Sequence, residues 1–281
     1  MKFGAHAFVW EGEWNEATGR RVISEAARIG LDFVEIPLLH PESFDGPATK
    51  RMLDDHGIGA TYSLGLPASA GLPDQPAAAE RFLRLAVDTI ASAGGDTLTG
   101  VIYGTLGELP GRPPNDDDYR VIAQVLASVA DYAAPQGIRL GIEPVNRYET
   151  FLVNTAAQAN DLLDRIDSDR VFIHLDTYHL NIEEESYGDA IRLAGKRMGY
   201  IHLSESHRGT PGTGTVNWDD VFGGLKDIGF RGALVMESFV KLNPDIARAT
   251  CMWRDIVKDP EALIRDGVAF LTAKAKAYGL E

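Results

Sequence analysis

The stretches RLGIEPV (139–145), VFIHLDTY (171–178) and YIHLSE (200–205) are short β-rich runs, each about one supersecondary unit from the next. Five more runs of this kind lie at residues 2–9, 33–39, 59–65, 97–103 and 233–239. Segments of helical period separate them, such as 77–93 and 117–134. Strands that alternate with helices predict parallel βαβ units. Eight units in 281 residues predict an α/β fold, a single (β/α)₈ TIM barrel that forms one domain over residues 1–281.

Residues typical of helix ends support the alternation of helices and strands. A glycine just before the next run suits the left-handed cap of a helix, and this is the position of Gly30, Gly57, Gly94, Gly137 and Gly229. Asn181 followed by Glu184 is typical of an N-cap with its capping-box partner. We therefore interpret the acidic run at 183–185 as a helix start and not as a metal site.

The composition of the sequence limits which binding partners and which cellular compartment are expected. The formal net charge is −14, which disfavours nucleic acid and anionic membrane surfaces. Cys251 is the one cysteine of the sequence, so no intrachain disulfide is expected and a reducing compartment is favoured. The N-terminal residues show no signal-peptide pattern, and no apolar run reaches membrane-spanning length. These features predict a cytoplasmic protein.

Four consecutive late strands carry a side chain that could bind a metal: Glu143, Asp176, His202 and Glu237. In each strand the apolar residues lie on the other parity, so these four are expected to point into the barrel while the apolar set faces the helices. Because barrel strands are parallel, their carboxyl ends meet at one mouth.

Three carboxylates and an imidazole at one mouth would repel each other without a cation. This donor set suits Mn²⁺, Co²⁺ or Mg²⁺, and we expect Mn²⁺ first. A single acidic residue at a strand end is usually a helix cap or a solubilising group, so the prediction depends on the set of four. His174, on an otherwise apolar strand, is interpreted as a core histidine whose hydrogen bonds are satisfied.

At these residues the chain resembles the ketose 3-epimerases, the family of D-tagatose, D-allulose (psicose) and L-ribulose 3-epimerases, in the xylose isomerase-like TIM-barrel superfamily. The resemblance covers essentially the whole chain. It rests on the stretches GIEPVNRYET (141–150), HLDTYHLNIEE (174–184), YIHLSESHRGTPGTG (200–214), VMESF (235–239) and MKFGAHAFVWEGEW (1–14).

The resemblance implies roles for individual residues. Glu143, Asp176, His202 and Glu237 match the family's metal ligands, and Glu143 and Glu237 match its two catalytic carboxylates. Glu149, His179 and Arg208 match groups that hold the O1 to O3 end of the ketose. The sugar pocket would be lined by Trp14, Gly65 and Phe239. His6 departs from the family, which usually carries an aromatic residue there. How the protein recognises the far end of the sugar, and therefore which ketose it prefers, stays open.

The implied activity is epimerisation of a free ketose at C3. The pairs are D-fructose/D-allulose, D-tagatose/D-sorbose and L-ribulose/L-xylulose. The cation would stabilise an enediolate, while one carboxylate removes the C3 proton and the other returns a proton to the opposite face. No organic cofactor is expected, since no GxGxxG follows a strand. The family also suggests a homodimer or homotetramer, for which residues 249–254 are a candidate contact.

Three alternatives remain open at this point. An aldose–ketose sugar isomerase of the same barrel type would have a similar metal site. A metal nuclease resembling AP endonucleases would need more histidines at strand ends and a basic face, whereas this chain has seven histidines and a charge of −14. A non-catalytic sugar-binding protein would need no second carboxylate.

Overall fold

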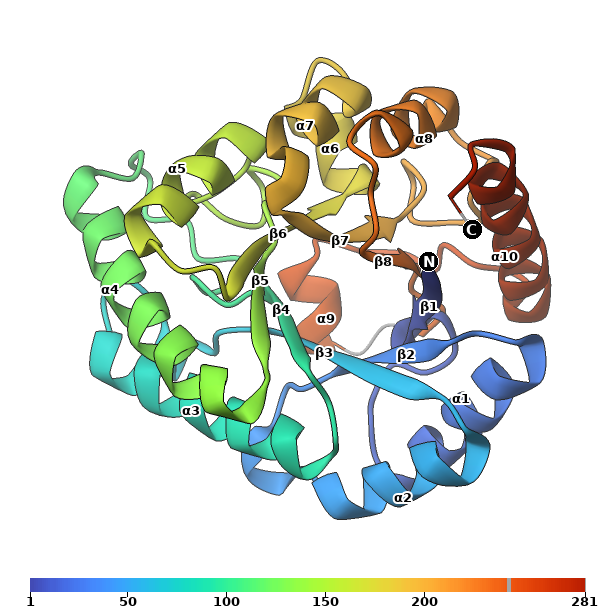
Figure 1. Ribbon diagram of the computed structural model, residues 1–281, viewed down its shortest axis with the longest axis horizontal. Coiled ribbons are helices and arrows are strands. Elements are labelled where there is room, and N and C mark those ends of the chain that lie inside the picture. Colours follow the sequence, from blue (N-terminus) through green and yellow to red (C-terminus); the bar gives the residue numbers. More distant parts are fainter. Residues whose placement is uncertain (242–243, 281) are drawn as a thin grey trace.

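The computed structural model describes residues 1–241 and 244–280 and shows a closed barrel of eight parallel strands in the order β1 to β8, ringed by helices (Figure 1). The strands are β1 Lys2–His6, β2 Phe33–Pro37, β3 Gly59–Gly65, β4 Thr97–Val101, β5 Arg139–Ile142, β6 Val171–Asp176, β7 Met198–Leu203 and β8 Ala233–Met236. The prediction of a (β/α)₈ TIM barrel is confirmed. That residues 1–281 form one domain stays a prediction.

Helices follow the strands, and most of them cover the outside of the barrel. They are α1 Glu16–Ile29, α2 Gly46–His56, α3 Pro76–Ser92, α4 Asp116–Ala133, α5 Ala156–Ile166, α6 Thr177–Glu183, α7 Tyr187–Ala194, α8 Trp218–Asp227, α9 Pro244–Ala249 and α10 Pro260–Ala277. Of these, α9 lies across the mouth of the barrel (Figure 1). The segments predicted at 77–93 and 117–134 differ from α3 and α4 by one residue at each end. In the described part of the chain, no helix combines the length and hydropathy that crossing a bilayer requires.

The predicted glycine caps are confirmed, because all five glycines have positive φ angles. Gly30, for example, ends α1 with φ 84° and donates its N–H to Ala26 and Ala27 carbonyls. The N-cap predicted at Asn181 is wrong, since this residue lies inside α6. The helix begins earlier because the Asp176 carboxylate already caps it, accepting the N–H of Tyr178.

The two faces of the strands have different environments, as the alternation predicted. The outward residues of β5 to β8 pack in the main apolar core with the helices: Leu140, Ile142, Ile173, Leu175, Ile201, Leu203, Leu234 and Met236. A smaller cluster of Phe33, Phe172, Tyr200 and Val235 packs separately, on the inward parity. Gly4 and Gly141 make room for its rings, since a Cβ there would lie 2.5 Å from Phe33 and 2.6 Å from Phe172.

Seven of the eight strands end two or three residues earlier than predicted, and only β3 ends at the predicted residue. β5 was predicted to reach residue 145 and β8 residue 239, whereas the ladders end at Ile142 and Met236. In β5 the reason is Pro144, which has no N–H to donate to a neighbouring strand. Glu143 and Glu237 therefore follow their strands directly and lie at the rim of the mouth.

Candidate functional site

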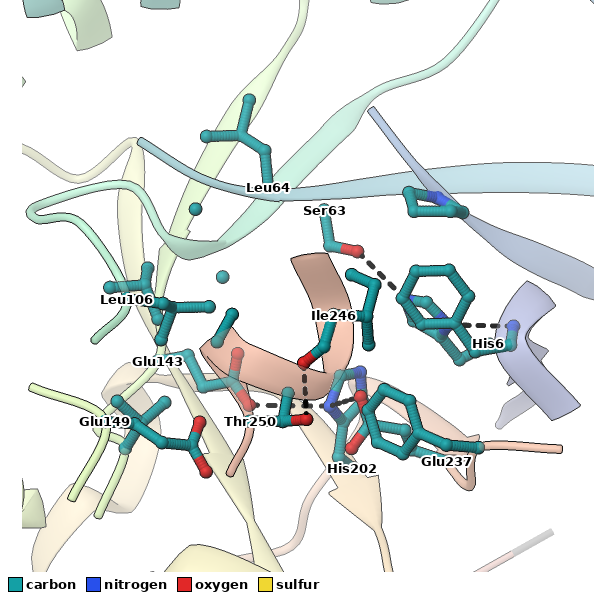
Figure 2. A pocket seen from close by; sticks show the side chains of 18 of the residues that line it. His6, Ser63, Leu64, Leu106, Glu143, Glu149, His202, Glu237, Ile246 and Thr250 are labelled. Carbon is teal, nitrogen blue, oxygen red and sulfur yellow. Dashed lines mark hydrogen bonds and ion pairs between the residues drawn. The ribbon is translucent and has the colours of Figure 1, made fainter. Parts of the chain in front are cut away.

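Glu143, Asp176, His202 and Glu237 come together at the carboxyl ends of β5 to β8, and all four are buried. Asp176 and His202 are register partners on β6 and β7. His202 Nδ1 lies 3.4 Å from Glu143 Oε1, 3.5 Å from Glu237 Oε1 and 4.0 Å from Asp176 Oδ2. The two glutamates approach this nitrogen from two sides (Figure 2). The structure thus brings together the four side chains that the strand pattern singled out.

The donor set fits a divalent cation. His202 Nδ1 is buried and has no hydrogen-bond partner, although three carboxylates surround it. Burying an unpaired imidazole nitrogen is costly, and a cation between these groups would remove that cost. Ligand atoms of Asp176, His202 and Glu237 lie within 4.8 Å of one another, as do those of Glu143, Asp176 and His179.

Arg208 is a buried cation beside these acids. Its Nη1 donates to Asp176 Oδ2 at 2.8 Å and also to Glu237 Oε2. The guanidinium lies 3.9 Å from the centre of the Tyr178 ring, and the Arg208 backbone has a positive φ of 61°. A non-glycine residue in this region is strained, and such strain is typical of a functional site.

His179, at the start of α6, has a tautomer that its neighbours define. Its Nδ1 accepts the backbone N–H of Asn146 at 3.0 Å. With Nδ1 accepting, the hydrogen of a neutral ring lies on Nε2. This nitrogen lines the central cavity, 3.7 Å from Asp176 Oδ2 and 4.0 Å from Glu143 Oε1, and lies 3.3 Å from a second donor, Arg208 Nη2. Burial lowers the pKa of His179 to about 3, so the ring offers a neutral N–H donor.

Asn146 organises the same corner of the site. Its side-chain Nδ2 donates to Glu149 Oε1 at 2.7 Å. Glu149 is almost fully buried, and burial raises its pKa to about 7. One asparagine thus holds His179 through its backbone N–H and holds Glu149 through its side-chain Nδ2, which also lies 2.9 Å from His179 Nδ1.

The two glutamates at the rim differ electrostatically. Burial, with added repulsion from Glu237 and Asp176, raises the pKa of Glu143 to about 7. Burial also works to raise the pKa of Glu237, but Arg208 and His202 outweigh it and hold that pKa below its ordinary value. Two nearby carboxylates with pKa values pushed apart are the arrangement that acid–base pairs use.

The cavity above these groups is lined by three of the four predicted pocket residues, namely His6, Gly65 and Phe239. Trp14 is not among its lining side chains. It packs instead over Gly19 and against the cluster of Ile23, Met52 and Leu53, because the chain turns into α1 two residues later. Leu39, Leu106, Val145, Ile246 and Thr250 also line the cavity.

His174 is only half satisfied, so the interpretation of it as a fully bonded core histidine is wrong. Its Nδ1 pairs with Thr99 Oγ1 at 2.8 Å, while its buried Nε2 has no partner. Nδ1 also lies 3.8 Å from Glu143 Oε2.

Glu35 and Asn146 are site residues that the sequence reasoning missed. Glu35 lies between Val34 and Ile36 on β2, is fully buried, and its Oε2 lies 2.7 Å from His202 Nε2. The parity rule that identified Glu143 applies to Glu35 as well, so a charged residue in the middle of an apolar strand was an available signal. Asn146 gave no comparable signal, because asparagine is an ordinary loop residue.

Comparison with known proteins agrees with this geometry. The family model of the xylose isomerase-like TIM barrel matches residues 23–274. The chain is 39% identical over 277 residues to an L-ribulose 3-epimerase of Methylomonas sp. (strain DH-1), covering 96% of both chains. It is 37% identical to a ketose 3-epimerase of Arthrobacter globiformis, covering 99% of this chain and 98% of the relative.

A solved structure shows the same likeness in three dimensions. The D-allulose 3-epimerase from Methylomonas sp. in complex with D-allulose superposes with a TM-score of 0.93 at 38% identity, covering 98% of this chain and 97% of the other. By fold and site the protein is a xylose isomerase-like TIM barrel. Within that superfamily the chain belongs to the ketose 3-epimerases and is an isomerase, more narrowly a carbohydrate epimerase.

Proposed function

We propose that this protein is a metal-dependent ketose 3-epimerase that interconverts free ketoses at C3. The observation that carries the proposal is the buried, unpartnered His202 Nδ1 with Glu143 and Glu237 on two sides of it. Family membership supports the reaction class, since the named relatives are 3-epimerases.

Four residues would hold the cation: Glu143, Asp176, His202 and Glu237. We expect Mn²⁺ first, with Co²⁺ or Mg²⁺ also accepted, because oxygen-rich sites discriminate weakly among these ions. A bound divalent ion would supply Lewis-acid stabilisation of the negative charge that develops on the ketose oxygens when the C3 proton leaves.

Glu143 and Glu237 would move the protons. Epimerisation removes a proton from one face of C3 and returns one to the other, which a single base does poorly. The two carboxylates come from strands that are not neighbours, β5 and β8, and approach the same centre from two sides. One acts as the base while the other, protonated, acts as the acid, and the roles exchange in the reverse reaction.

His179, Arg208 and Glu149 would fix the reacting end of the ketose. His179 presents a neutral Nε2–H, and Arg208 presents a charged donor already held by Asp176. Glu149 offers a carboxyl group that is anchored by Asn146. Rigid placement of C3 between two carboxylates supplies much of the rate enhancement, because the reactants need no further ordering.

The substrate range that we propose is D-fructose/D-allulose, D-tagatose/D-sorbose and L-ribulose/L-xylulose. The relatives named for L-ribulose and for D-psicose support both five- and six-carbon ketoses. We also propose a homodimer or homotetramer with residues 249–254 as a contact. Trp253, in this segment, is 74% exposed, which is unusual for a tryptophan and favours a contact surface.

The test is deuterium exchange at C3. Metal-stripped protein is reloaded with Mn²⁺ and incubated in D₂O with D-fructose, and separately with L-ribulose, and the sugars are followed by NMR. Metal-dependent deuterium at C3 together with the inverted epimer is the expected result. Deuterium at C1 or C2 with an aldose product would assign the protein to the aldose–ketose isomerases instead.

A further inference from the structure

A buried carboxylate lies behind His202, on the opposite side of its ring from the three acids. Glu35 belongs to β2 and has no exposed surface. Its Oε2 accepts a hydrogen bond from Tyr200 Oη at 2.7 Å and lies 2.7 Å from His202 Nε2. The Tyr200 hydroxyl is in turn 2.7 Å from Thr61 Oγ1. Three strands thus contribute to a short chain of hydrogen bonds that ends on His202.

This series of hydrogen bonds determines which nitrogen of His202 carries the hydrogen. Tyr200 donates to Glu35 Oε2, so that oxygen is an acceptor and its bond with His202 needs a hydrogen on Nε2. The neutral ring then has its lone pair on Nδ1. Nδ1 is the nitrogen without a hydrogen-bond partner, and it faces Glu143 and Glu237. Without Glu35, the ring could rotate or adopt the other tautomer.

A salt bridge to Arg or Lys does not account for the burial of this charge. Among the ion pairs of the described residues, Glu35 pairs with His202 and with His6, whose Nε2 is 3.5 Å from Oε1. Its Oε1 is buried without a hydrogen bond. A buried carboxylate that lacks a permanent cation destabilises the fold, which points to a functional reason for its presence.

We propose that Glu35 is a positioning residue of the metal site, which holds His202 in the Nε2–H tautomer and aims its Nδ1 lone pair at the cation. The inference rests on the proposed function, in which His202 is a metal ligand. A carboxylate behind a ligating imidazole also makes the ring a stronger donor, and its loss weakens metal binding by about 10–100-fold in metalloproteins. Glu35 lines the cavity but lies outside the proposed ligand set, and it acts on the cation through His202.

The experiment compares Glu35→Gln with wild-type protein in two measurements that do not use turnover. The first is the Mn²⁺ dissociation constant, obtained by calorimetric titration of the metal-stripped protein. The second is the tautomer of His202 in the metal-free protein, read from ¹⁵N shifts of labelled histidine at a pH high enough to make this ring neutral, because burial lowers its pKa but the surrounding carboxylates outweigh burial and raise that pKa. Tyr200→Phe is a milder second variant, because it removes one of the two hydrogen bonds to Glu35 Oε2 and leaves the carboxylate in place.

Thr99→Val is the matched control. It removes one buried hydrogen bond to the neighbouring barrel histidine, His174, and leaves the hydrogen bonds of Glu35 to Tyr200 and His202 in place. We expect the Mn²⁺ dissociation constant to rise about 10–100-fold in Glu35→Gln, by a smaller factor in Tyr200→Phe, and by less than about twofold in Thr99→Val. The Nε2–H form of His202 should dominate in wild type and lose its dominance in Glu35→Gln.

Equal affinity and equal tautomer populations in wild type and Glu35→Gln would overturn the inference. An equal loss of affinity in Glu35→Gln and Thr99→Val would also overturn it, because it would show a general effect of a lost buried hydrogen bond. If wild-type protein binds Mn²⁺ without epimerising any ketose, the proposed function fails while the role of Glu35 stands. If wild type binds no divalent ion, both fail.

Discussion

The two halves of the barrel contribute different things to the same cavity. The ends of β5 to β8 and the loops after them supply Glu143, Asp176, His202 and Glu237 with His179 and Arg208. The ends of β1 to β4 supply walls: His6, Pro37, Ser63, Gly65 and Val101. The comparison teaches that the proposed chemistry is concentrated in the second half. The first half shapes the space where the rest of the sugar lies, apart from Glu35 on β2, which supports His202. Substitutions in the two halves should therefore differ in kind.

The largest effect is expected at Glu237, in the half of the barrel formed by β5 to β8. Glu237→Gln keeps the shape of the side chain but removes a proton-transfer group, so kcat should fall about 10²–10⁴-fold. Steady-state kinetics would measure this, with metal content determined for each preparation. Glu80→Gln, on α3, where the carboxylate contacts Arg84 and Ser128 away from the cavity, is the control and should keep wild-type turnover. Near-normal turnover in Glu237→Gln would exclude the two-carboxylate mechanism.

His179→Ala should come next. It removes a fixed donor to the substrate, which should lower kcat/KM roughly tenfold, or about 1–2 kcal/mol. The Mn²⁺ dissociation constant should remain at the wild-type value, because His179 is outside the proposed ligand set. Loss of bound metal in this variant would mean that the ligand assignment is wrong.

Asn146 contacts two proposed substrate-binding residues. Asn146→Ala removes the contacts of Nδ2 with Glu149 and with His179 Nδ1 but keeps the backbone N–H that holds His179. We expect KM to rise a few-fold, about 1 kcal/mol, with little change in kcat. Asn146→Asp should be worse, since it places a second carboxylate against Glu149. Equal kinetics for the two variants would argue against a role for this hydrogen bond.

The smallest effect is expected at His6, in the half of the barrel formed by β1 to β4. His6→Phe should change the ratio of kcat/KM for D-fructose over L-ribulose by roughly tenfold or less, since one lost contact changes selectivity by about 1 kcal/mol. Metal affinity should change little, because His6 is outside the proposed ligand set and pairs with Glu35 Oε1, whereas the bonds to Tyr200 and His202 are made by Glu35 Oε2. A large loss of turnover on both sugars would contradict the division of the cavity into two halves.

The site residues from β5 to β8 could be predicted from the sequence far better than those from β1 to β4. Strand parity and the spacing of β5 to β8 predicted that Glu143, Asp176, His202 and Glu237 meet, and they do. The same rules could not place Trp14, because its side chain lies in a connecting segment and packs back against α1 and α2. A strand imposes a period of two on its side chains, whereas a loop imposes no comparable rule.

The sequence by itself determined the barrel, its glycine caps and the side chains that face its mouth, because these follow from local periodicity and from parallel strands that share a direction. Only the tertiary structure decided what lies behind those side chains. Glu35 reaches His202 across 167 residues of sequence, and Asn146 reaches His179 across 33. Contacts of this kind depend on barrel closure, which brings β2 opposite β7, and on how a loop folds back, and neither leaves a period in the chain.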